Sequence, residues 1–200
     1  MTVKEAEVRK QLSVLVILVE AASLAMLLIV LWRRIVPDTA GAALLLFLPI
    51  AFGLHVTEEF IWPGGFIAWD NILRPQFTET AGSFYVKVNA IPAVGSLLLA
   101  LGTLSTPGGN NWSAVLTWLT IATFMSWNAV FHLRGAIRTK LYSPGMVTGL
   151  ALFVPLTLTS YVHFVHAGLP PLLALVSAAI AFAIQPILNL IKRGGAKEAA

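Results

Sequence analysis

Residues 11–32 read QLSVLVILVEAASLAMLLIVLW, an apolar run in which Glu20 is the only charged side chain. A helix needs roughly 20 largely apolar residues to cross the hydrocarbon core of a bilayer. The run is too long for a signal peptide, and Arg33 and Arg34 follow it in place of the small residues of a cleavage site. It therefore predicts a retained transmembrane helix.

The rest of the chain has the same character. Its 200 residues are 58% hydrophobic and 11% charged, with a mean hydropathy of +0.83, whereas a soluble domain carries about 25% charged residues. Five more stretches are long and apolar enough to span a membrane. We therefore predict an all-α polytopic membrane bundle that forms a single domain, 1–200. Its six predicted spans are 11–32, 41–62, 84–104, 112–133, 144–165 and 170–191.

Local signals mark several of the helix starts. Asn111 precedes the fourth span and is a favoured N-cap residue, and Ser143 followed by Pro144 predicts an N-cap and first turn for the fifth. The longest connection joins the second and third spans. Its mixture of apolar and polar residues over about 65–75 predicts a short interfacial helix, either a membrane-hugging connector or a lid over a site.

The basic residues predict the orientation. If the N-terminus is cytoplasmic, eleven of the thirteen Lys and Arg residues lie inside and only Arg33 and Arg34 lie outside. The positive-inside rule therefore places both termini in the cytoplasm. The net charge of +4 is thus a topology signal, and no basic patch with interleaved aromatic residues suggests nucleic-acid binding. The lack of cysteine excludes disulfides, thiol nucleophiles and thiolate metal sites.

Polar residues within the spans are costly, so each one indicates a role. The second span contains GLHVTEEFIW, in which His55, Glu58 and Glu59 are spaced i, i+3 and i+4 and share one helical face. The fourth span contains SWNAVFHLRG, which places Asn128 and His132 on one face by the same i, i+4 rule.

Depth brings these motifs together. At 1.5 Å per residue, His55 lies about 10 Å and Asn128 about 9 Å from the predicted cytoplasmic ends of their spans. Tyr142, in LYSPG, lies near the same surface, and Lys87 and Asn89 begin the third span there. Four helices therefore bring their unusual polar residues to one leaflet, which predicts a single site.

Two chemistries suit this set of residues. Imidazole and carboxylate ligands favour Zn, Fe or Mn, so His55, His132 and Glu58 or Glu59 are candidate ligands of a divalent metal. Metal-free acid–base catalysis is the alternative, with the two glutamates beside a histidine dividing the proton-transfer roles. A third interpretation is an interfacial polar turn that extends to water.

The other candidate residues have supporting roles in this hypothesis. Asn128 is expected to orient His132 or the substrate, and Tyr142 to donate a hydrogen bond. A second group is expected to bind substrate, its cations either holding an anionic group or serving as cytoplasmic anchors. This group is Lys87, Asn89, Arg134 and Arg138.

Three motifs, HVTEE at 55–59, NAVFH at 128–132 and YSPG at 142–145, resemble the HXXEE family of bacterial integral membrane proteins. The motifs occur in the family's order, and the resemblance covers about 40–190. It implies a multi-pass protein of the bacterial inner membrane and supports the site residues. The family's function is uncharacterised, so the resemblance implies no particular reaction.

From these observations we expect a membrane-embedded enzyme that acts at the cytoplasmic leaflet. The expected partners are membrane lipids and a lipophilic substrate such as a lipid or an isoprenoid-like molecule. One alternative is a small proton- or ion-coupled transporter that uses Glu20, His55 and Glu58 as a relay. Another is a non-catalytic membrane subunit.

Overall fold

The computed structural model describes residues 3–33, 37–77, 82–105 and 111–198, without the side chains of 77, 185 and 192–198. Most of the described residues are helical, and there is no strand among them. In chain order the elements are α1 (Val3–Arg33), α2 (Thr39–Val56), η1 (Thr57–Ile61), α3 (Phe66–Leu73), η2 (Pro75–Phe77), α4 (Gly82–Leu104), α5 (Trp112–Thr139), α6 (Met146–Thr148), η3 (Gly149–Phe153), α7 (Val154–His166) and α8 (Pro171–Glu198).

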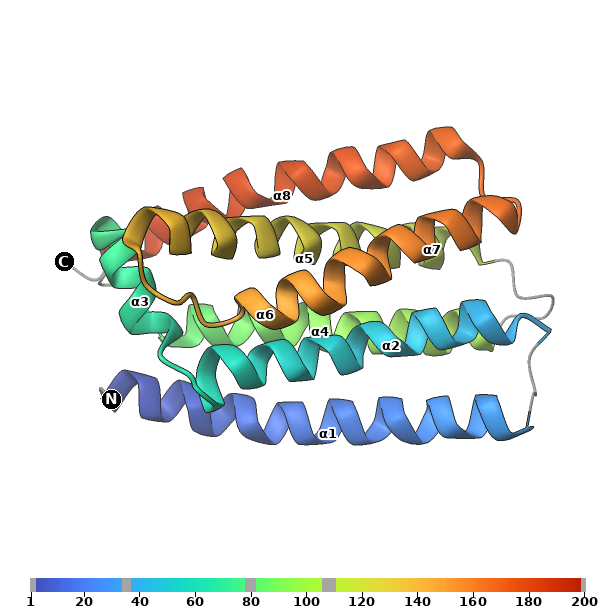
Figure 1. The fold of residues 1–200 in the computed structure, drawn as a ribbon, viewed down its shortest axis with the longest axis horizontal. Coiled ribbons are helices and arrows are strands. Elements are labelled where there is room, and N and C mark those ends of the chain that lie inside the picture. The colour runs from blue at the N-terminus through green and yellow to red at the C-terminus, as the bar shows by residue number, and fades with distance from the viewer. Residues whose placement is uncertain (1–2, 34–36, 78–81, 106–110, 199–200) are drawn as a thin grey trace.

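Among the described residues, six helical segments are long and apolar enough to cross a membrane, which confirms the predicted polytopic bundle. The long helices lie side by side, and both termini lie at the same end of the bundle (Figure 1). We call this the termini end. The short helix α3 also lies there, within the connection for which an interfacial helix is predicted.

Helix ends show what hydropathy alone misses. Asn111 caps α5 as predicted, accepting a hydrogen bond from the backbone N–H of Ala114 at 3.2 Å. The helix then continues to Thr139, past the predicted span end at 133, and α1 begins at Val3 rather than near residue 11. An apolar run defines what fits in the bilayer, but a helix can continue into polar residues beyond it.

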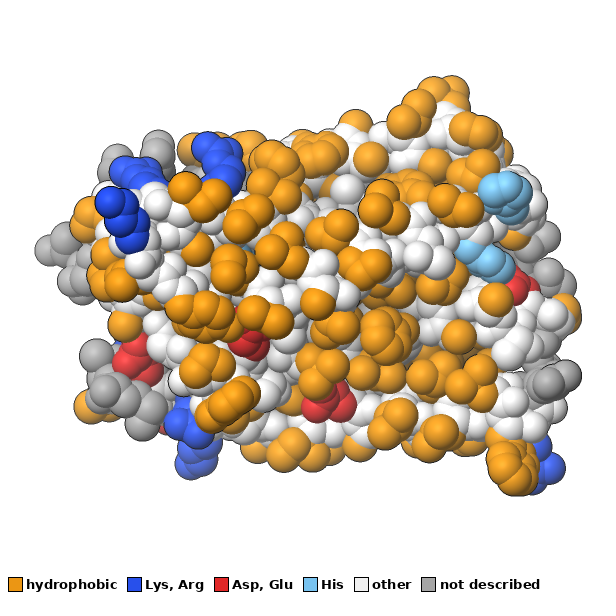
Figure 2. All heavy atoms as spheres, in the orientation of Figure 1, with side chains coloured by type: hydrophobic (Ala, Val, Ile, Leu, Met, Phe, Trp, Pro, Cys, Tyr) orange, Lys and Arg blue, Asp and Glu red, His pale blue; other side chains and the backbone are white. Residues whose placement is uncertain are grey.

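Large apolar side chains cover the outside of the helices. Leu18 in α1, Leu98 in α4, Leu158 in α7 and Leu175 in α8 are each more than 60% exposed. Figure 2 shows hydrophobic side chains along the middle of the visible face, with the Lys and Arg side chains mainly near the termini end. Such a surface suits lipid better than water. Arg34 and the side chains of Lys192, Arg193 and Lys197, which entered the charge count, lie outside the described residues.

The side chains that the structure describes form two apolar clusters in the interior. The larger includes Leu46, Phe52, Trp118 and Phe153 and occupies the middle of the bundle. Its Trp118 indole N–H donates to the carbonyl of Leu45 at 3.0 Å, which ties α5 to α2. A second cluster lies near the termini end.

This second cluster surrounds the polar residues described below. It joins α1, η1, α3 and α4 through Val8, Phe60, Phe66, Trp69 and Tyr85, among others. Because apolar groups surround them, the polar side chains at this end must satisfy one another.

Candidate functional site

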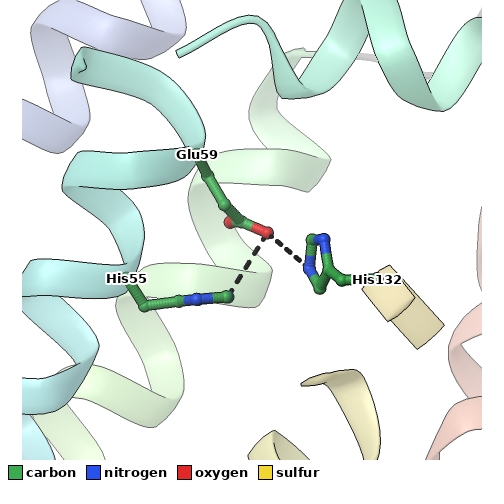
Figure 3. A group of neighbouring side chains, drawn as sticks. All are labelled: His55, Glu59 and His132. Atoms are coloured by element: carbon green, nitrogen blue, oxygen red, sulfur yellow. Dashed lines mark ion pairs between the residues drawn. The ribbon is translucent and has the colours of Figure 1, made fainter. Parts of the chain in front are cut away.

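His55, Glu59 and His132 meet inside the bundle (Figure 3). They lie where α2 approaches the termini end (Figure 1). Oε1 of Glu59 lies 3.4 Å from Nε2 of His55 and 3.1 Å from Nε2 of His132. None of the three residues is more than 3% exposed. We call them the His–Glu–His group.

The helix carrying two of these residues changes its winding at the site. α2 ends at Val56 and continues as the π-helical turn η1, which contains both Glu58 and Glu59. A second π-helical turn, η3, directly follows Thr148 on the opposite wall. Single π-helical turns within α-helices are frequent at functional sites. Here the first π-helical turn contains two adjacent glutamates whose side chains contact different residues.

Asn128 completes the group from α5, one turn before His132. Its Nδ2 lies 3.4 Å from Nε2 of His55 and 3.2 Å from Nε2 of His132. The structure therefore brings together four of the residues that the sequence selects, from two distant motifs.

Glu58 faces a different direction from Glu59. Its carboxylate accepts hydrogen bonds from the backbone N–H groups of Val147 and Thr148, at 3.1 and 2.7 Å, and from the Thr148 hydroxyl at 2.5 Å. The Tyr142 hydroxyl donates to it as well. Glu58 thus holds the YSPG segment against α2 and lies outside the group of possible metal ligands.

Tyr142 is the predicted hydrogen-bond donor, and the structure gives it Glu58 as its acceptor. Partial burial of the phenol and its hydrogen bond to the carboxylate raise the pKa of Tyr142. The phenol therefore keeps its proton at neutral pH and remains a donor to Glu58.

Hydroxyl groups fix the two imidazole rings. The Thr148 hydroxyl has one proton, which it donates to Glu58, so its oxygen accepts from Nδ1–H of His55 at 3.0 Å. This arrangement assigns the proton of neutral His55 to Nδ1 and leaves the Nε2 lone pair facing Glu59. The Ser143 hydroxyl lies 2.8 Å from Nδ1 of His132 and can hold that ring in the same way.

Ser143 differs from its predicted role. The helix begins at Met146 with Gly145 at its N-cap, so Ser143 is not the cap and its side chain serves His132 instead. Gly145 has φ +95° and passes directly over the group. An added Cβ at this position would lie 2.7 Å from Cε1 of His55 and 2.9 Å from Cε1 of His132. Only glycine leaves both rings in place.

Aromatic side chains form the remaining walls. The Trp69 ring is stacked on His132 with centroids 5.7 Å apart and planes 15° from parallel. Phe153 packs edge-on against His55 at 5.2 Å, and Phe66 lies 5.5 Å from His132. Trp69 can approach so closely because Gly135 has no side chain; a Cβ there would lie 2.6 Å from Cη2 of Trp69.

A narrow cavity of about 80 Å³ reaches the group from the side of α4 and α8. Glu59 and Asn128 both line it. Asn89, a predicted substrate-binding residue, is buried and also lines it, while its amide donates to the Tyr85 carbonyl of its own helix at 2.9 Å. The cavity admits water or a small part of a substrate to the group.

The remaining candidates lie farther from the His–Glu–His group. Arg134 and Arg138 are exposed and line a wider groove next to the cavity, whereas Lys87 is exposed and lines neither. Glu20 packs against Gly53 of α2, outside the His–Glu–His group.

Sequence reasoning missed Thr148 and Trp69. Thr148 lies three residues after YSPG, on the first turn of the helix that follows the motif. Its side chain could therefore have been expected to face the same way as the motif. Trp69 lay in the predicted interfacial helix, but nothing in the sequence shows that this helix folds back onto His132.

The family described as proteins of unknown function with an HXXEE motif matches residues 45–160, more than half of the chain. This match includes all three motifs that build the site. No significant match was found among curated proteins or solved structures.

Proposed function

The chain belongs to the family of proteins of unknown function with an HXXEE motif, and we propose that it is a membrane-embedded enzyme with a metal centre. His55, Glu59 and His132 are the proposed ligands. The proposed metal is Zn, Fe or Mn, which accept mixed imidazole and carboxylate ligands.

The convergence of two imidazole Nε2 atoms on one carboxylate oxygen is the observation that carries this proposal. Ligand atoms held about 2.0–2.1 Å from a tetrahedral metal lie about 3.3 Å from one another. The observed separations of 3.1 and 3.4 Å from Glu59 Oε1 fit that spacing. In addition, each Nδ1 has a hydroxyl partner, the arrangement that orients metal-binding histidines in proteins.

Electrostatics also favours a cation here. With the proton of His55 on Nδ1, its Nε2 lone pair faces the Glu59 carboxylate. The lone pair and the carboxylate repel each other, and the surrounding apolar side chains do not screen this repulsion. Either a proton or a metal ion between them removes the repulsion. Three protein ligands leave a position open, and a catalytic divalent ion uses such a position to activate water or to polarise a substrate oxygen.

The other residues have distinct proposed roles. Asn128 borders both histidines and the cavity, so it can orient His132 or a substrate oxygen. Glu58, Thr148 and Tyr142 hold the loop that positions the rings. Because the cavity is too small for a whole lipid, most of a lipophilic substrate lies outside it. We place the site in the cytoplasmic leaflet from the distribution of basic residues.

Metal-free acid–base catalysis is the second candidate function. The two N–H groups of Asn128 are close enough to donate to both Nε2 atoms, and this would satisfy the lone pairs without a metal. Glu59 and a histidine would then exchange a proton with the substrate.

Metal content of the purified protein distinguishes the two candidates. Detergent-purified wild type is loaded with Zn, Fe or Mn, desalted and measured by mass spectrometry alongside His55→Ala and His132→Ala. We expect about one ion per wild-type chain and its loss in both variants. His166→Ala is the matched control, because this exposed histidine lies at the opposite end of the bundle. Folded wild type that retains no metal overturns the metal centre and favours acid–base catalysis.

A further inference from the structure

A groove at the termini end combines cations with apolar side chains. It lies next to the site cavity and has a volume of about 570 Å³, within the usual range of small-molecule sites. Arg134 and Arg138 of α5 line it together with Arg74. Leu73, Trp127 and Ile137 supply much of its apolar lining. We call it the arginine groove.

The three arginines differ in how their charge is balanced. Arg74 forms an ion pair with Asp70, with Nη2 at 2.5 Å from Oδ1, and its guanidinium lies 4.5 Å from the centre of the Phe131 ring. Arg134 and Arg138 are exposed and have no ion pair with any side chain that the structure describes. The described lining of the groove contains no carboxylate. The groove therefore has an excess of positive charge.

The spacing of the two exposed arginines suits one anion. Residues 134 and 138 are i, i+4 on α5, so their guanidinium groups lie on the same face and repel each other. An anion with several oxygens between them removes that repulsion and accepts hydrogen bonds from both. Guanidinium groups bind phosphate in this way with two parallel hydrogen bonds.

The groove adjoins the site cavity. The two share Arg74, Phe131 and Asn189 as lining residues. Along α5, Arg134 lies two residues beyond His132 and six beyond Asn128, a rise of about 3 and 9 Å at 1.5 Å per residue. A group bound at the arginines thus lies next to the cavity that reaches the His–Glu–His group.

We propose that the arginine groove binds the phosphate of an anionic amphiphile and that the apolar part of this molecule reaches the His–Glu–His group. The substrate class is a phosphate-bearing lipid. This inference rests on the proposed function, because it names the substrate of the same site.

Binding of short-chain lipids to metal-free, detergent-purified protein tests the inference. The probes are dihexanoyl phosphatidic acid, dihexanoyl phosphatidylcholine and inorganic phosphate, with affinity measured by calorimetry. We expect phosphatidic acid to bind most tightly, because it alone combines a doubly acidic headgroup with tails. Inorganic phosphate or phosphatidylcholine binding as tightly as phosphatidic acid contradicts the inference.

Variants then locate the binding. The double variant Arg134→Gln, Arg138→Gln is expected to weaken phosphatidic acid binding about tenfold or more, since each bond to a charged group contributes about 1.5 kcal/mol or more. Lys10→Gln, Lys140→Gln is the control, because it removes the same charge from exposed positions outside the groove. Equal weakening in the two double variants, or none in either, overturns the inference.

The outcome is separate from that of the proposed function, because lipid binding is measured without metal and metal content without lipid. Wild type that binds phosphatidic acid but no metal contradicts only the metal centre. Phosphatidic acid binding that is unchanged in the Arg134→Gln, Arg138→Gln variant contradicts only the groove.

Discussion

Replacement of Gly145 by alanine tests the close approach of the backbone to the two histidines. Gly145 has φ +95° and ψ −10°, a region that side chains disfavour by about 1–3 kcal/mol. The new Cβ would also lie 2.7 and 2.9 Å from the rings of His55 and His132. Ordinary carbon contacts begin near about 3.5 Å, so the rings must move by about 0.6–0.8 Å. Such overpacking costs about another 1–3 kcal/mol.

Gly65→Ala is the matched control for backbone strain. Gly65 has φ +89° and ψ 12°, almost the same conformation, but an added Cβ would meet nothing within 4 Å. The free energy of unfolding is measured by SDS titration in mixed micelles, with and without metal. We expect both variants to lose about 1–3 kcal/mol to strain and Gly145→Ala to lose about 1–3 kcal/mol more.

Metal affinity gives the sharper difference between these two variants. Ligand distances at a metal site tolerate changes of about 0.2 Å, so ring movements several times larger should weaken binding by about tenfold or more. Gly65→Ala should bind metal like the wild type. If Gly145→Ala is no less stable than Gly65→Ala and binds metal equally well, the placement of Gly145 over the histidines is wrong.

Three further predictions concern the hydroxyl partner, the pH dependence and the topology. Thr148→Val should lower metal affinity about 10–100-fold in a competition titration, as loss of such partners does elsewhere, and Thr148→Ser should restore it. Burial raises the pKa of Asp38, but hydrogen bonds from the Gly41 backbone N–H and from His163 outweigh it and lower the pKa overall. The contribution of ionised Asp38 to stability is therefore present above its unfolded pKa of about 3.9 and is lost as the pH falls below that. In thermal unfolding, Asp38→Asn should reduce the pH dependence of stability in this range. The change should be small because the pair of Asp38 and His163 is exposed. A topology reporter fused at 108 should report the outside of the membrane and one at 195 the cytoplasm, and the reverse result contradicts the proposed leaflet.

Hydropathy and charge were enough to predict the bundle. An apolar run as long as 11–32 is typical of a transmembrane helix, and asparagine, as at position 111, is an effective N-cap before a helix. The ends of α1 and α5 could not be predicted in the same way, because beyond the bilayer nothing in hydropathy distinguishes a continuing helix from a loop.

Part of the site could also be predicted. The i, i+4 spacings of His55 with Glu59 and of Asn128 with His132, at matched depth, place four side chains on two facing helices. The different directions of Glu58 and Glu59 could not be foreseen, because they accompany a π-helical turn that no periodicity indicates. The stacking of Trp69 on His132 depends on how a connection folds back, which is a tertiary property.

X-ray absorption spectroscopy of the metal-loaded protein tests the central claim most directly. The proposed centre predicts two imidazole nitrogen ligands at about 2.0–2.1 Å together with at least one oxygen, if the metal is zinc. His55→Ala and His132→Ala, which are expected to lose the ion, should not give this imidazole-containing spectrum after the same loading. A wild-type spectrum without imidazole ligands, or one that both substitutions leave unchanged, contradicts the metal centre.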